Sequence, residues 1–228
     1  MPATPLPPSG DIPKPKTCDA SGMADIHRMF KAGFREAPTL IGGVAQGDTA
    51  HAGIVAEQLN LLSVALHAHH EGEDQRLWQP LADRAPSCAV HVERMKQHHA
   101  QLLVHLTAMD DALPAWRLSA KATDAAPVLT AIDGVNAALD VHLPDEEATI
   151  VPVMETVITQ DEVEWFAQHG RKATPKGQTW NSLGAILDAQ PDGGDIWLHK
   201  NLPGPVRVLW RWVGKPKYEK HRAALEGR

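Results

Sequence analysis

Apolar residues recur every three or four positions along most of the first 160 residues. This spacing predicts amphipathic helices, because it places the apolar side chains on one helix face. Helices are expected over residues 21–36, 48–84, 87–112 and 124–157. Pro38 and the glycines at 42 and 43 are expected to end the first helix, and Pro114 the third. Four long helices with short links predict an all-α fold, an up-and-down four-helix bundle.

The remaining residues have a different sequence pattern. Thr159 followed by Glu162 is a capping-box pattern, which predicts a fifth helix ending near Gly170. Shorter helical segments separated by Gly and Pro follow. Residues 1–20 hold six prolines and no apolar run, so they predict a flexible tail and not a secretion signal. Three parts are therefore expected: a tail (1–20), a bundle (21–158) and a helical C-terminal extension (159–228).

The composition and charge of the chain argue against several classes of protein. The chain has 228 residues, 43% of them hydrophobic, and a net charge of −6. It has no apolar run long enough to span a membrane. Its two cysteines form no CxxC motif, so a cytoplasmic location is expected. The acidic balance and the lack of a groove-reading motif argue against nucleic-acid binding.

The C-terminal end is basic. Residues 199–228 hold eight Lys or Arg against two Asp or Glu. Trp197, Trp210 and Trp212 lie in or beside this stretch. We expect the segment to dock on the bundle through its tryptophans, with contact to a protein or a membrane surface as the alternative.

The histidines are the candidate functional residues of this chain. Seven of the 13 histidines lie between His67 and His105. Two pairs have the form His-x-x-x-Glu, in which both side chains share one helix face: His69 with Glu73, and His142 with Glu146. Each pair lies on an apolar stripe, where an unpaired carboxylate is costly. A metal ion at the centre of the bundle would remove that cost.

The other two helices each offer one inward imidazole. His27 lies on the stripe that contains Phe30 and Phe34. His99 shares a face with apolar residues such as Leu102, whereas its neighbour His98 lines up with a polar side. Five further histidines are expected on solvated faces, with His70 retained as a hydrogen-bonding partner of a ligand: His67, His70, His91, His98 and His105.

Four imidazoles and two carboxylates without a thiolate suit a pair of first-row metal ions, iron or manganese, with zinc as an alternative. The predicted metal ligands are His27, His69, Glu73, His99, His142 and Glu146.

These residues follow the order found in a known family. The segments HHEGEDQRLWQPL (69–81) and HLPDEEATIVPV (142–153) resemble the two motifs of hemerythrin-like, or HHE cation-binding, proteins. The resemblance covers residues 21–158, and the longer C-terminus is similar to that of a bacterial subgroup. It implies an oxo- or hydroxo-bridged centre of two iron ions, with Glu73 and Glu146 as bridges and four histidines as terminal ligands. Members of the family handle O₂, iron, peroxide or nitric oxide.

The sequence departs from the oxygen-carrying hemerythrins at three places. Met95 stands where their third helix has a further histidine, which opens a position for water, an exogenous ligand or another residue. Their last motif has a spacing of five, which would select Glu147; Glu146 has the better core-facing phase, and Glu147 is the alternative ligand. Pro144 lies between His142 and Glu146 and removes one helical hydrogen bond.

Reversible oxygen carriage is disfavoured by these departures, and redox chemistry at an open site is favoured. The expected function is binding or reducing O₂, peroxide or nitric oxide in an oxidative or nitrosative stress response. One alternative is a non-catalytic oxygen or iron sensor, or an iron-binding module. A second is a zinc-dependent hydrolase built on the same bundle.

Overall fold

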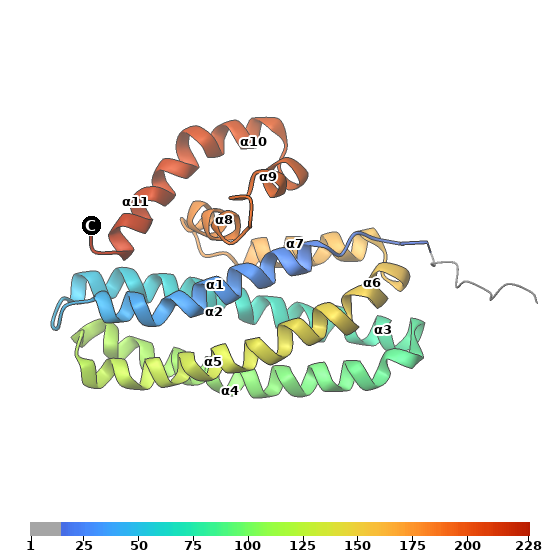
Figure 1. The fold of residues 1–228 in the computed structure, drawn as a ribbon, viewed down its shortest axis with the longest axis horizontal. Helices are drawn as coiled ribbons and strands as arrows, with labels where there is room; N and C mark the ends of the chain where they lie inside the picture. The colour runs from blue at the N-terminus through green and yellow to red at the C-terminus, as the bar shows by residue number, and fades with distance from the viewer. Residues whose placement is uncertain (1–14) are drawn as a thin grey trace, which may run out of the picture.

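A computed structural model describes residues 15–228, and helices dominate it (Figure 1). The described residues contain no strand. The first part comprises α1 (Gly22–Gly43), α2 (Thr49–Arg76), α3 (Trp78–Arg84), the short 3₁₀ turn η1 (Pro86–Cys88), α4 (Ala89–Ser119), α5 (Ala122–Thr149) and α6 (Val151–Val157). The second comprises α7 (Gln160–Ala173), α8 (Thr179–Asp188), α9 (Asp195–Asn201), α10 (Gly204–Leu209), the π-helical turn η2 (Trp210–Gly214) and α11 (Lys215–Leu225).

Helices α1, α2, α4 and α5 lie side by side as a four-helix bundle, so the predicted all-α fold is confirmed (Figure 1). Its core is formed by the apolar stripes of these helices, with Phe34, Leu59, Leu102 and Val135 fully buried. Burying one such side chain stabilises the fold by roughly 1.5–3 kcal/mol. The tail predicted for residues 1–20 lies mostly outside the described residues. Within the described part, the Thr17 amide donates to the Glu155 carbonyl over 2.7 Å.

The predicted helix ends at Pro38 and Pro114 are wrong. Helix α1 continues through Pro38 to Gly43, and α4 continues through Pro114 to Ser119. A proline inside a helix removes one hydrogen bond. Here the turns beyond each proline bury large apolar residues, Ile41 in α1 and Trp116 in α4, and this packing outweighs the lost bond.

The C-terminal extension packs against α1 and α2 (Figure 1). Leu225 of α11 is buried in the bundle core, and Arg222 forms an ion pair with Glu36 of α1. Tyr218 donates a 2.7 Å hydrogen bond to Asp188, which joins α11 to α8. Helix α11 is therefore docked on the bundle, but the expected docking through tryptophans is wrong: Trp210 packs in a separate cluster with residues of α8, and Trp212 is exposed.

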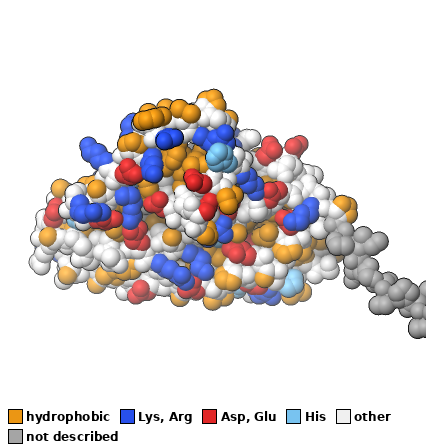
Figure 2. Space-filling model, turned by 45° about the horizontal axis from the view of Figure 1, so that its top comes forward, with side chains coloured by type: hydrophobic (Ala, Val, Ile, Leu, Met, Phe, Trp, Pro, Cys, Tyr) orange, Lys and Arg blue, Asp and Glu red, His pale blue; other side chains and the backbone are white. Residues whose placement is uncertain are grey.

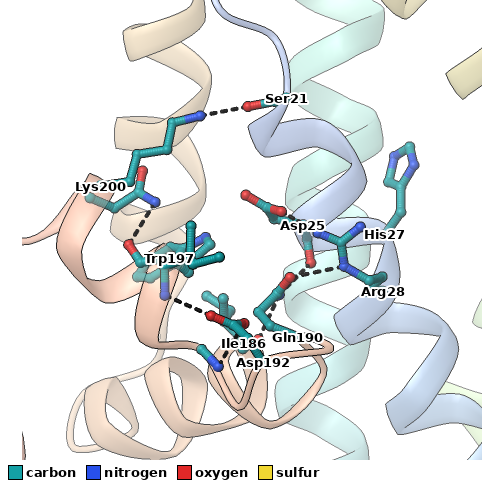
Figure 3. A network of polar contacts seen from close by, with 12 residues as sticks. Ser21, Asp25, His27, Arg28, Ile186, Gln190, Asp192, Trp197 and Lys200 are labelled. Atoms are coloured by element: carbon teal, nitrogen blue, oxygen red, sulfur yellow. Dashed lines mark hydrogen bonds and ion pairs between the residues drawn. The ribbon is translucent and has the colours of Figure 1, made fainter.

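A polar network fastens the extension to α1 beside one of the predicted ligands (Figure 3). The Arg28 guanidinium donates to the side-chain oxygen of Gln190 over 2.9 Å, and the Gln190 amide donates to the Asp25 carbonyl over 3.2 Å. The ring of His27 points away from this network (Figure 3). Helix α1 thus presents one face to the extension and another to the bundle interior.

No helix in residues 15–228 combines the length and apolar character needed to cross a membrane.

Candidate metal centre

Histidine and glutamate side chains from all four bundle helices lie together at one place in the interior. Four of these side chains, His27, Glu73, His142 and Glu146, are completely buried. The contributing residues are His27 from α1, His69, His70 and Glu73 from α2, His99 from α4, and His142 and Glu146 from α5. The six predicted ligands are therefore brought together, with one histidine that was not among them.

The seven side chains divide into two groups, and within each group the ligand atoms lie within 4.8 Å of one another. We call them group A and group B. Group A contains His27, His69 and Glu146. Group B contains His70, Glu73, His99 and His142. Two adjacent groups of three or four donors match the ligand requirement of two metal ions.

The two glutamates lie between the groups. The Oε1 atom of Glu73 is 3.4 Å from Nε2 of His69 in group A, and its Oε2 atom is 3.4 Å from Nε2 of His99 in group B. The Oε2 atom of Glu146 lies 3.4 Å from Nε2 of His27 and 3.6 Å from Nε2 of His142. Each carboxylate therefore reaches both groups, as a bridging ligand must.

The donor atoms fit a metal because they lack other partners. Both carboxylate oxygens of Glu73 and Glu146 are buried without a hydrogen bond to any described residue. The same holds for Nε2 of His70, His99 and His142. Leaving such groups unpaired costs several kcal/mol, about 1–3 for each atom. Cations held between them would satisfy these lone pairs together.

A family comparison agrees with this geometry. The model of the hemerythrin HHE cation-binding domain matches residues 20–154. The chain belongs to this family. Searches of the curated proteins and of the solved structures find no match. The family implies metal binding, typically of iron, and the buried cluster of this HHE domain supplies donors of the right kind.

Two further carboxylates orient the imidazoles of the HHE domain from outside. Nδ1 of His27 donates to Oε1 of Glu147 over 2.9 Å. Nδ1 of His99 donates to Oδ1 of Asp74 over 2.9 Å, and the same oxygen accepts a 2.6 Å bond from Trp78. Holding the proton on Nδ1 leaves the Nε2 lone pair directed at the centre and increases its basicity.

Glu146 and Glu147 occupy different positions relative to the donors. Glu146 is fully buried within group A, whereas the Glu147 side chain is 40% exposed and contacts the outer nitrogen of His27. Glu146 thus lies among the donor side chains, whereas Glu147 lies on the outer side of the His27 ring.

His70 was expected on a solvated face, and this is wrong: it is only 8% exposed. Its ring stacks on His99 with centroids 4.1 Å apart, and it belongs to group B. Helix α2 contacts α1, α4 and α7, so more than one of its faces is buried. The rings against His70 are those of His99 on α4 and His142 on α5, so the spacing within α2 held no signal for this placement.

Met95 occupies the position of the missing histidine without offering a nitrogen. Its side chain is fully buried and packs with Trp78 and Ile150 in an apolar cluster. Group B instead obtains a third imidazole from the neighbouring helix, in His70. His70 is therefore placed where a further residue could serve the position that Met95 leaves open.

The other expected surface histidines lie outside both groups. His67 contacts Asp110 over 3.0 Å, and His91 contacts Arg94 over 3.0 Å. His98 is half-buried, with its ring 5.9 Å from that of His142.

The electrostatics of the HHE domain favour neutral imidazoles at three of the donors, whereas contacts with two glutamates raise the pKa of His27 despite its burial. Burial lowers the pKa of His69 and His70 well below the usual range, and it lowers that of His142 to about 4. Neutral imidazole is the form that binds metal. Burial and the neighbouring Glu146 carboxylate raise the pKa of Glu73. Two adjacent buried carboxylates repel each other, which is a second reason to expect cations between them.

Proposed function

We propose that this HHE domain holds two iron ions, one in each group, bridged by Glu73 and Glu146, and that it binds or reduces O₂, peroxide or nitric oxide. The observation that carries this proposal is the contact of each buried glutamate with histidines of both groups. Nitrogen and carboxylate donors without thiolate suit iron. Bound iron would supply one-electron redox chemistry and an open coordination position.

The two groups contain different numbers of histidines. This difference supports binding of the small molecule at one of the two metal ions in preference to the other. Group A contains two histidines and group B contains three. With both glutamates shared, group A offers one protein donor fewer. We place the open position there, on the side of His27 and His69.

The surroundings of group A suit a small, weakly polar ligand. The Phe30 ring lies 5.4 Å from that of His69 and is 1% exposed. Leu66, one turn before His69 on α2, is fully buried. These apolar side chains exclude bulk water, so a diatomic molecule or peroxide meets little competition for the position.

The sensor alternative has its own supporting observation. Arg28, which follows a group A donor, is held by Gln190 of the C-terminal extension over 2.9 Å (Figure 3). A change in the position of α1 on ligand binding would reach the extension through this contact. A hydrolase with a single zinc ion is less well supported, because the donors divide into two groups.

The small-molecule part of the proposal is tested on iron-loaded protein under anaerobic conditions. Visible absorption is recorded while nitric oxide, hydrogen peroxide or O₂ is added, and turnover is then measured with a chemical reductant. We expect a saturable spectral change with at least one of the three. No change with any of them, in protein that contains two iron ions, overturns the redox proposal. A spectral change without turnover favours the sensor.

A further inference from the structure

The outer side of α10 and η2 carries an exposed apolar strip. Val208 is 59% exposed, Leu209 47% and Trp212 71%. They lie within five residues of one another, together with the exposed cations Arg211 and Lys215. We call these five residues the α10 ridge. Such large apolar side chains are normally scattered singly over a surface, so a cluster on one helix indicates a contact site.

The apolar strip is not needed to hold the helix in place. The inner side of η2 and α11 buries Trp210 and Tyr218 against Leu183 and Leu187 of α8. Helix α10 lies on the far side of the molecule from α4 and α5 (Figure 1). Figure 2 shows hydrophobic side chains along this outer edge with Lys and Arg beside them. The ridge therefore protrudes from a helix that is already anchored.

The segment that carries the ridge is rich in positive charge. Between Ile196 and Tyr218 the chain has five Lys or Arg and no Asp or Glu, although its net charge is −6. The Arg211 guanidinium lies over the ring of Trp212, 5.6 Å from the centroid, whereas Lys215 lies 3.9 Å from a carboxylate oxygen of Glu219 on the next turn. The charge of Arg211 is thus available to an anionic partner.

We propose that the α10 ridge docks on an anionic lipid bilayer surface. Tryptophan and aliphatic side chains insert between lipid headgroups, while Lys and Arg remain at the phosphates. A protruding ridge with cations beside an apolar strip and no acidic residue fits a flat anionic surface. Docking leaves the bundle, with its metal centre, facing away from the bilayer.

The experiment is sedimentation of the full-length chain with vesicles at low and at moderate salt. Vesicles of phosphatidylcholine with phosphatidylglycerol are compared with vesicles of phosphatidylcholine alone. We expect binding to the anionic vesicles only, with weaker binding at higher salt. Arg211→Gln should weaken this binding about fivefold, the loss expected for one cation at the surface. Trp212→Ser should weaken it about tenfold or more.

Two control variants match these substitutions elsewhere on the surface. Leu118→Ser removes an apolar side chain that is 79% exposed on α4, and Lys121→Gln removes an exposed cation. Both should bind vesicles as the parent chain does, and circular dichroism checks that every variant is folded. No binding to anionic vesicles overturns the proposal and directs attention to a protein partner for the ridge. Equal binding to neutral vesicles, or ridge variants that behave as the controls do, overturns it as well.

Discussion

The outer nitrogen of His27 lies 2.9 Å from a carboxylate oxygen of Glu147, the residue that follows the buried Glu146. The same arrangement recurs on α2, where Asp74 follows the buried Glu73 and holds His99 over 2.9 Å. Consecutive residues of a helix point about 100° apart. One carboxylate of each pair can therefore enter the centre while the next orients a histidine from another helix.

Glu147→Gln tests this orienting role. The amide keeps a hydrogen-bonding oxygen but loses the charge that makes His27 a stronger donor. We expect iron affinity to fall about 10- to 100-fold with the fold intact, measured by competition with a chelator. Glu71→Gln is the matched control, because Glu71 is exposed and, among the described residues, its side chain hydrogen-bonds only with Gln75. Equal loss of iron from both variants would contradict the orienting role.

His70→Ala tests the added donor of group B. Because this group would lose one of its three imidazoles, we expect iron retained after exposure to a chelator to fall from two ions per chain towards one. His67→Ala, which removes a half-exposed histidine on the same helix, should leave the iron content unchanged. Unchanged iron content and spectrum in His70→Ala would assign this residue a packing role only.

Glu73→Gln should have opposite effects on the metal-free and metal-loaded chain. Burial and Glu146 raise the pKa of Glu73, so the metal-free fold binds its proton more tightly than the unfolded chain does. The associated stability is present below pH 4.5, the ordinary pKa, and is lost as pH rises through the raised pKa. At pH 7 we expect Glu73→Gln to stabilise metal-free protein by about 1–3 kcal/mol.

The measurement for this variant is thermal unfolding of metal-free protein between pH 5 and about 8. The parent chain should lose more stability with rising pH than Glu73→Gln does. In iron-supplemented preparations the order should reverse, because the variant lacks a bridging carboxylate. A metal-free variant that is less stable than the parent at every pH would contradict this account.

Gly72→Leu tests the contact between α7 and the helix that carries three donors. A Cβ atom at Gly72 would lie 3.3 Å from the His169 ring and 3.4 Å from the Phe166 ring. A larger side chain must displace α7, so we expect a loss of about 1–3 kcal/mol in urea unfolding and faster iron release to a chelator. Gly53→Leu on the same helix meets no atom within 4 Å and is the control.

Much of the fold and six of the seven central side chains could be predicted from the sequence, because helical spacing determines which residues share an inward face. The spacing of four between His142 and Glu146 also favoured the glutamate that the structure buries. His70 could not be placed in this way. Its ring lies against those of His99 and His142, and periodicity within α2 contains no information about the side chains that α4 and α5 bring there.

The ends of α1 and α4 were misplaced for a similar reason. Proline signals a helix end locally, but the core contacts of Ile41 and Trp116 are made with other helices. The orienting roles of Asp74 and Glu147 likewise depend on histidines 25 and 120 residues away in the chain. Such pairings follow from the assembled bundle and not from any single segment.

The central claim is that the two groups each hold one iron ion. Elemental analysis of the full chain from iron-supplemented cells, with a visible spectrum of the same sample, tests it most directly. The account predicts about two iron ions per chain and charge-transfer absorption from a bridged pair, both lost in Glu73→Ala. One zinc ion per chain, or a colourless metal-free protein that does not take up iron, would contradict it.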